Sequence, residues 1–151
     1  MKKILISIAA SVAILAACSE NNSQRAADNI LNTAEKYFSE GQYDMAMKVI
    51  DSLRKEYPTA VETRKKALKL YQNAALKEAQ ADLALTDQKM QEAIKEYDIK
   101  KKIVDKAKAE LKASAEELDA LTKMKMRLDS LQVRFDTQCA KIKYIHKKQK
   151  E

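Results

Sequence analysis

The stretch from Thr59 to Lys150 contains neither glycine nor proline. The only glycine, Gly41, and the only proline, Pro58, both precede it. β-Rich folds need these residues at their many turns, and Rossmann folds and P-loops need a glycine-rich turn around phosphate. Ala, Lys, Leu, Glu and Gln dominate instead, which is typical of long helices. The sequence therefore predicts an all-α fold, in which a short helical hairpin precedes long coiled-coil-type helices.

The first residues have the pattern of an export signal. Lys2 and Lys3 precede a 14-residue apolar run, Ile4 to Ala17, which suits a signal peptide and is short for a membrane-spanning helix. The run ends in Leu15-Ala16-Ala17-Cys18. This string resembles the lipobox of bacterial lipoproteins, whose cysteine is acylated and becomes the first residue after cleavage. The resemblance implies a signal peptide over residues 1–17 and a lipid anchor on Cys18.

The residues after the cysteine bear on where such a lipoprotein is sorted. In many Gram-negative bacteria, aspartate at this place retains a lipoprotein in the inner membrane, so Ser19 favours the outer membrane. Some phyla read an acidic cluster here as a surface-export signal, and Glu20 alone leaves surface display open. We therefore expect a lipid-anchored envelope protein on the outer membrane, facing the periplasm. Residues 18–25 are polar and without periodicity, which predicts a flexible tether.

Residues 26–58 carry two apolar runs at helical spacing on either side of Gly41. The first run comprises Ala27, Ile30, Leu31, Ala34, Tyr37 and Phe38, and the second comprises Tyr43, Ala46, Met47, Ile50, Leu53 and Tyr57. We expect Gly41 to end the first helix in a left-handed conformation and Pro58 to end the second. Thr59 is the expected N-cap of the next helix, and Glu62 completes a capping box.

Part of this hairpin has the spacing of a tetratricopeptide repeat. The residues that carry the resemblance are Ala34, Tyr37, Gly41, Tyr43, Ala46, Leu53 and Pro58. The string Gly41-Gln42-Tyr43 followed by Tyr57-Pro58 is similar to repeats in outer-membrane assembly lipoproteins. The resemblance covers about one repeat, and a second copy from Val61 lacks the Gly-x-Tyr turn. A generic αα-hairpin, whose small residues allow close packing, is the alternative interpretation.

Residues 59–151 carry two series of apolar residues. The first recurs every seven positions at Leu76, Leu83, Met90, Tyr97, Val104, Leu111 and Leu118. The positions three residues later are mostly small, which favours close helix pairing, and they are Ala79, Thr86, Ala93, Lys100, Ala107 and Ser114. The second series comprises Leu121, Met124, Leu128, Leu131, Phe135, Ile142 and Ile145. The spacing changes phase between the two series.

Two arrangements explain this change of phase. In one, a long helix ends near Ala113 and a second helix returns as its antiparallel partner, with Ser114 and Glu117 forming a capping box. In the other, a single helical rod continues and pairs with another chain. The phase change coincides with the capping box, which favours a break at residues 113–115.

Basic residues concentrate far from the expected anchor. Residues 18–98 hold 12 Lys and Arg against 14 acids, residues 99–138 hold 10 against 7, and residues 139–151 hold 5 against 1. The densest clusters are Lys100, Lys101 and Lys102, then Lys141, Lys143, Lys147, Lys148 and Lys150. These clusters predict contact with a polyanion. For an envelope lipoprotein, this means anionic lipid or wall groups or an acidic protein, rather than nucleic acid; solvated helix faces are the other interpretation.

The sequence predicts no catalytic, metal or cofactor site. The only histidine, His146, lies in the lysine-rich tail. Beside Cys18 the only cysteine is Cys139, which has no partner at metal-ligand spacing. Because Cys139 lies near the second apolar series, we expect its side chain to be packed, with an intermolecular disulfide as the alternative.

Taken as a whole, the pattern predicts a non-enzymatic envelope lipoprotein. Acylated Cys18 would hold it on the lipid bilayer, and the helices would bind a protein partner, so that the chain acts as an adaptor or spacer. Two alternatives stay open: a periplasmic holdase-type chaperone with basic coiled-coil arms, and a non-covalent cell-wall tether. The long helices also allow pairing with a second copy of the chain.

Overall fold

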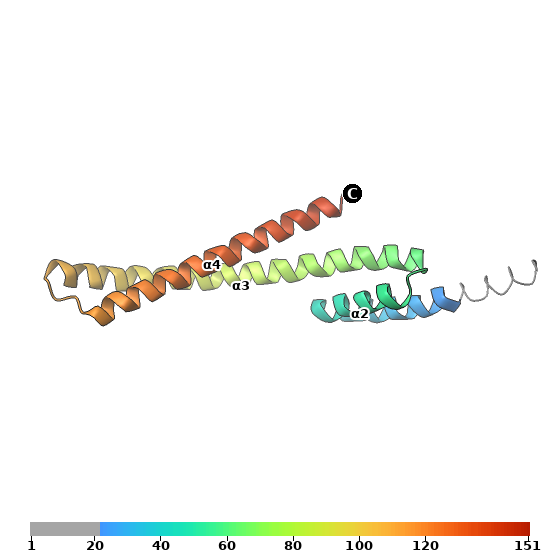
Figure 1. The fold of residues 1–151 in the computed structure, drawn as a ribbon, viewed down its shortest axis with the longest axis horizontal. Helices are drawn as coiled ribbons and strands as arrows, with labels where there is room; N and C mark the ends of the chain where they lie inside the picture. The colour runs from blue at the N-terminus through green and yellow to red at the C-terminus, as the bar shows by residue number, and fades with distance from the viewer. Residues whose placement is uncertain (1–21) are drawn as a thin grey trace, which may run out of the picture. The chain divides into compact units, whose positions relative to one another are not determined.

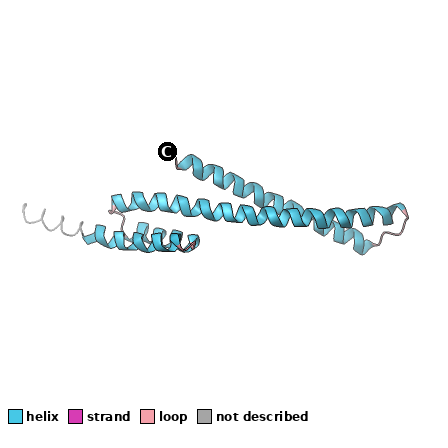
Figure 2. Ribbon diagram, turned by 180° about the vertical axis from the view of Figure 1, so that it is seen from behind, coloured by secondary structure: helices cyan, strands magenta, loops and turns pink. Residues whose placement is uncertain are grey.

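The computed structural model describes residues 22–151, which form four helices and no strand. The first helix covers residues 22–39, and it is followed by α2 (Tyr43–Glu56), α3 (Val61–Ala109) and α4 (Ala115–Lys148) (Figure 1; Figure 2). The predicted all-α fold is confirmed for these residues. The predicted lipidation and sorting residues, Cys18, Ser19 and Glu20, lie outside the described part of the chain.

The chain divides into two compact units, and the division falls between Glu78 and Ala79 within α3. The first unit combines the helix of residues 22–39, α2 and the start of α3. Its buried core consists of Ala27, Leu31, Ala34, Ile50, Leu53, Ala60 and Ala67. The apolar runs of the predicted hairpin thus supply most of this core, and α3 adds the rest.

Gly41 ends the first helix in a left-handed conformation with φ +76°, as predicted. Its N–H donates to the Phe38 carbonyl at 3.1 Å, and the N–H of Gln42 donates to the Tyr37 carbonyl at 2.9 Å. These two bonds form a Schellman motif, which satisfies carbonyls that the helix end would otherwise leave without partners. The rings of Phe38 and Tyr43 then meet across the turn, with centroids 5.4 Å apart.

Two boundaries of this unit differ from the sequence prediction. Residues 22–25 are helical, although the sequence predicts a tether there. α3 begins at Val61, so Thr59 is not its N-cap. Instead, the Ala60 carbonyl accepts the first helical hydrogen bond, from Arg64 at 2.9 Å. Ala60 is also buried in the core of this unit.

A polar contact joins the first helix to α3 inside the first unit. The Thr63 hydroxyl, which is fully buried, donates to the Asp28 carboxylate. Gln24 Nε2 donates to Thr63 Oγ1 and lies 3.4 Å from Asp28 Oδ1. A buried hydroxyl without a partner is costly, so this contact selects one arrangement of the two helices.

The second unit is a helical hairpin in which α4 returns along the later part of α3 (Figure 1). α3 ends at Ala109, and Ser114 is the N-cap of α4. Ser114 Oγ accepts from the Glu117 N–H at 3.2 Å, and Glu117 Oε2 accepts from the Ser114 N–H at 3.1 Å. The predicted capping box is therefore present.

Leu111 does not continue the predicted heptad series. It lies in the turn after α3, has a left-handed φ of 59° and is 95% exposed. Its N–H donates to the Lys108 carbonyl and the Lys112 N–H donates to the Ala107 carbonyl, which is the same Schellman pattern as at Gly41. Leu118 is also exposed, at 38%. The series ends at Val104 because the helix itself ends five residues later.

The apolar series of α3 and α4 meet in one seam. On α3 the small positions are the more deeply buried, and Ala79, Thr86 and Ala93 are each at most 3% exposed. Leu83, Met90 and Tyr97 are only half-buried. On α4 the seam residues are half-buried as well, apart from Ile145, which is buried. Small residues on one helix thus let the larger side chains of the other approach closely.

Candidate functional site

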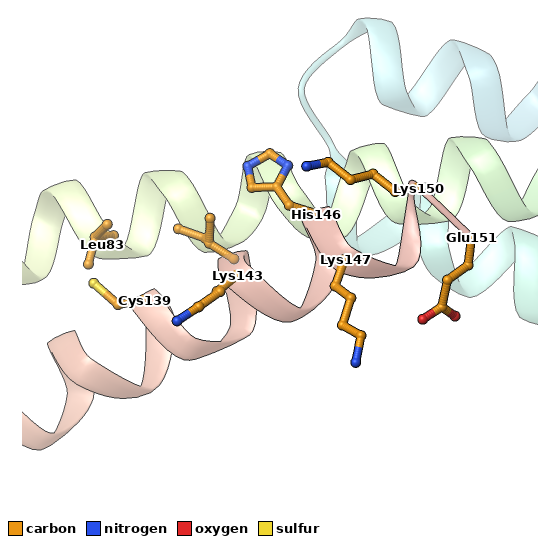
Figure 3. Close-up of a pocket in the computed structure, with 8 residues that line it drawn as sticks. Leu83, Cys139, Lys143, His146, Lys147, Lys150 and Glu151 are labelled. Atoms are coloured by element: carbon orange, nitrogen blue, oxygen red, sulfur yellow. The ribbon is translucent and has the colours of Figure 1, made fainter.

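An open groove of about 670 Å³ lies at the C-terminal end of α4, against α3 (Figure 3). Its lining residues are Leu83, Cys139, Ile142, Lys143, His146, Lys147, Lys150 and Glu151. Leu83 comes from α3 and the others come from the last turns of α4 and the residues after it. All of them belong to the second unit. The groove brings apolar and charged side chains together.

The floor of the groove is apolar. Leu83 and Ile142 belong to the seam between the two helices and are half-buried. Cys139 is exposed, and in Figure 3 its thiol points toward Leu83. The expectation that Cys139 is packed in the core is therefore wrong. Its side chain borders the open groove and is not enclosed by the seam.

The rim of the groove is basic. Lys143, Lys147 and Lys150 contribute ammonium groups, and His146 adds an imidazole. In Figure 3, His146 and Lys150 lie on one side of the α4 ribbon, while Lys147 and Glu151 point to the other. An apolar floor beside lysine ammonium groups can bind a ligand that has both an apolar surface and negative charge.

The single acid of the rim does not cancel this charge. Glu151 lies 2.5 Å from the ammonium of Lys148, which is outside the groove. The Glu151 carboxylate accepts a hydrogen bond there and raises the pKa of Lys148. The Tyr144 ring also lies near Lys148, 5.9 Å from its ammonium. Glu151 is thus paired with a fourth lysine, and the three lysines of the rim keep their positive field.

An ion pair beside the groove joins the two helices. Arg134 Nε donates to Asp82 Oδ2 at 3.0 Å, and its Nη2 donates to Asp82 Oδ1. The bond from Arg134 holds the pKa of Asp82 below its ordinary value, and a bond from Gln138 acts in the same direction. The Asp82 side chain is only 19% exposed. Because Asp82 precedes Leu83 and Gln138 precedes Cys139, this contact fixes which residues face each other in the groove.

Two further ion pairs follow the same antiparallel register. Arg127 Nη1 lies 3.1 Å from Glu96 Oε2, and Lys100 Nζ lies 4.0 Å from Glu117 Oε1. As the residue number on α3 rises, that of its partner on α4 falls. The sequence alone did not reveal these pairs because their partners are far apart in the chain, and only the position of the turn sets the register.

The structure separates the eight lysines predicted to contact a polyanion. Lys143, Lys147 and Lys150 line the groove. Lys141 acts electrostatically on Asp82, and Lys148 pairs with Glu151. The remaining three are Lys100, which reaches Glu117, Lys101, which pairs with Asp105 at 2.7 Å, and the exposed Lys102. None of these three lines the groove, so the two lysine clusters do not form one site.

The predicted hairpin residues have structural positions in the first unit. Ala34 and Ala46 are fully buried, and Tyr37 and Tyr43 are half-buried. Pro58 is exposed and follows α2. A second groove of about 230 Å³ lies nearby, lined by Arg54, Val61, Arg64, Lys65 and Leu68. It is smaller, and Arg64 is engaged with the Pro58 carbonyl at 2.6 Å.

Residues 22–151 contain no group of three His, Cys, Asp or Glu side chains placed to hold a metal ion. Within the same residues, no helix is both long and apolar enough to cross a bilayer. No protein family, no characterised protein and no solved structure shows detectable similarity to this chain. Proposals on function therefore depend on the residues themselves.

Proposed function

We propose that this protein is a lipid-anchored envelope lipoprotein that acts without catalysis, as an adaptor or spacer that binds a protein partner. The string Leu15-Ala16-Ala17-Cys18 supports the anchor, and Ser19 supports the periplasmic face of the outer membrane. Stable anchoring needs more than one acyl chain, which lipoprotein processing provides. The helices would then present binding surfaces away from the bilayer.

The observation that carries the binding role is the groove of α4. Its floor of Leu83, Cys139 and Ile142 is apolar, and its rim bears Lys143, Lys147 and Lys150. A partner segment with apolar side chains and flanking carboxylates complements both features. The apolar contacts would supply most of the affinity, and the lysines would speed association and fix orientation.

We further propose that residues 26–58 are a single tetratricopeptide-like hairpin and that α3 and α4 pair as an antiparallel coiled coil. The burial of Ala34 and Ala46 and the turn at Gly41 support the first. The heptad spacing of the seam and the cross-helix ion pairs support the second. The antiparallel pairing of α3 and α4 would hold the residues of the groove in one register.

Crosslinking in intact cells, followed by mass-spectrometric identification, tests the adaptor role. We expect one defined envelope protein to be captured through an acidic segment. The double substitution Lys143→Glu/Lys147→Glu should reduce capture at least tenfold, because it reverses two rim charges. Lys101→Glu/Lys102→Glu is the matched control, with the same change in net charge outside the groove, and it should leave capture intact. Equal loss in both variants, or capture of abundant bystanders only, contradicts the proposal.

The lipid anchor has its own test, which does not depend on a partner. In cells given a labelled fatty acid, the chain should become labelled and fractionate with the outer membrane. Cys18→Ser should abolish both labelling and retention, whereas Cys139→Ser should change neither. Labelling that persists in Cys18→Ser rejects this cysteine as the anchor.

The exposed apolar floor of the groove favours one second candidate, a holdase-type chaperone. Apolar surface beside cationic side chains can hold unfolded chains that bear negative charge. A chaperone should suppress aggregation of an unfolded β-barrel protein at ratios near one to one. An adaptor should leave that aggregation unchanged while still binding its folded partner.

A further inference from the structure

The outer face of α4 carries a second stripe of uncharged residues. These are Met126, Ser130, Val133, Thr137, Ala140 and Tyr144, and each is exposed. Met126, Val133 and Tyr144 are 63%, 66% and 60% exposed, respectively. The stripe lies within the second unit and is distinct from the groove. Three large apolar side chains therefore face solvent along one line of the helix.

The Ser130 and Thr137 hydroxyl groups of this stripe are already satisfied within α4. Ser130 Oγ donates to the Met126 carbonyl at 2.9 Å, and Thr137 Oγ1 donates to the Val133 carbonyl at 2.7 Å. These two hydroxyls do not need water as an acceptor, so a partner can cover them without leaving the donors unpaired.

The spacing of the stripe is that of a helix-pairing seam. Its steps are four, three, four, three and four residues, which keep one side of a helix facing a partner helix. At 100° per residue it lies opposite the seam of Leu128, Leu131 and Phe135 that faces α3. Charged residues bound it at both ends, because Asp119 and Lys123 precede it and Lys147 follows. The uncharged residues at this four-three spacing therefore extend from Met126 to Tyr144 and no further.

Charge flanks the stripe with mostly opposite signs. Asp129, Asp136 and Lys143 lie along one side, and Arg127, Arg134 and Lys141 lie along the other. In a parallel helix pair, the residue before Ser130, Thr137 or Tyr144 on one helix faces a residue five positions later on the other. Asp129 would then face Arg134 of the partner subunit, and Asp136 would face Lys141 of the partner subunit. By symmetry each of these pairs forms twice, and together they outnumber the like-charge contact of Lys143 with Lys148 of the partner subunit by two to one.

From this complementarity we propose that α4 pairs through this stripe with α4 of a second copy of the chain, parallel and in register. An antiparallel pair would bring the two basic flanks of Arg127, Arg134 and Lys141 together, which is unfavourable. Arg134 already binds Asp82, yet a guanidinium carries five N–H donors and can serve a second carboxylate.

The small size of the stripe implies that the pairing is weak between free molecules. Its apolar length of 18 residue steps corresponds to about 27 Å of helix, and three large side chains bury less than a stable dimer usually needs. Two chains held on one membrane would meet at a much higher effective concentration. The stripe itself belongs to α4 alone, so the inference does not depend on the proposed anchor.

Cysteines introduced one at a time on α4 of the full chain test the pairing and its direction. In a Cys139→Ser background, Ser130→Cys and Ala140→Cys place a thiol in each half of the stripe, and Gln132→Cys places an exposed thiol beside it. Under mild oxidation, both stripe variants should form disulfide dimers with themselves at least tenfold faster than Gln132→Cys. The Cys139→Ser parent measures any contribution from Cys18.

A charge-reversal variant tests the flanks. Asp129→Lys/Asp136→Lys, added to Ala140→Cys, should slow dimer formation about tenfold, because four modest ion pairs become repulsive. Glu110→Lys/Glu116→Lys makes the same change outside the stripe and should have no such effect. Far-UV circular dichroism verifies that all variants stay helical.

Three results would overturn this inference. The first is dimer formation by both stripe variants at the rate of Gln132→Cys. The second is a disulfide that forms only when Ser130→Cys and Ala140→Cys are mixed, which indicates an antiparallel pair. The third is equal slowing by the two charge-reversal variants, which indicates a general charge effect. None of these results bears on whether Cys18 is acylated.

Discussion

The two units of this chain bury their apolar residues to different degrees. Residues 22–78 enclose Ile50 and Leu53 completely, because three helical segments surround one core. In residues 79–151 most large seam residues are only half-buried, and Val104 and Ile145 are the exceptions. A pair of helices can cover only one face of each member. The second unit therefore relies more on ion pairs across the seam, and its remaining apolar surface is available for partners.

The largest expected effect on stability comes from truncating a leucine in each unit. Leu53→Ala should cost about 2–5 kcal/mol, because it leaves a cavity in a closed core. Leu131→Ala, at a half-buried seam position, should cost about 1 kcal/mol, because less surface leaves water there. Hydrogen exchange read peptide by peptide reports the opening of each unit separately. If the two substitutions cost the same, the two units do not differ in packing as described.

The buried polar contact of the first unit gives the next largest effect. Asp28→Ala should destabilise this unit by about 1–3 kcal/mol, because the fully buried Thr63 hydroxyl loses its acceptor. Asp44→Ala is the matched control, since Asp44 pairs with Lys48 on the surface of α2, where such pairs contribute about 0–1 kcal/mol. Urea unfolding of the two variants measures the difference. A cost for Asp28→Ala no larger than that for Asp44→Ala argues against the contact.

In the two Schellman turns, substitutions at the left-handed residue should change stability in opposite directions. A left-handed conformation costs an L-residue about 1–2 kcal/mol, and glycine avoids this cost but loses more freedom on folding. Gly41→Ala should therefore destabilise the first unit by about 0.5–1 kcal/mol, although a Cβ there meets no neighbour. Leu111→Gly should stabilise the second unit by a similar amount, because the leucine side chain buries almost nothing. Thermal unfolding measures both, and a destabilising Leu111→Gly contradicts the account.

These turns also show how far the sequence alone can predict the fold. Gly41 and the Ser114 capping box were predictable because each is encoded by residues a few positions apart. Leu111 was not, since a leucine at heptad spacing gives no sign that its helix has ended. The ion pair of Asp82 with Arg134 spans 52 residues, so it follows only once the turn fixes the register. The groove depends on that register, so its lysines were predictable as a cluster but their meeting with Leu83 across the seam was not.

The smallest effect concerns this ion pair and depends on pH. Arg134 lowers the pKa of Asp82 in the folded chain below its value in the unfolded chain. The stabilisation is therefore fully present above the ordinary carboxyl pKa of about 3.9, and it is lost as the pH falls through the lower folded value. Asp82→Asn should reduce stability at pH 7 by at most about 1 kcal/mol, and the deficit relative to wild type should shrink below about pH 4.

A double-mutant cycle with Arg134→Gln connects this pH effect to the register of the hairpin. If the two side chains act on each other, the double variant should lose less stability than the sum of the single variants, and this coupling should disappear at low pH. Full additivity at pH 7 would show that the pair contributes nothing to the seam. The residual stability of the second unit would then come from its half-buried apolar residues alone, and the difference between the two units would be one of packing only.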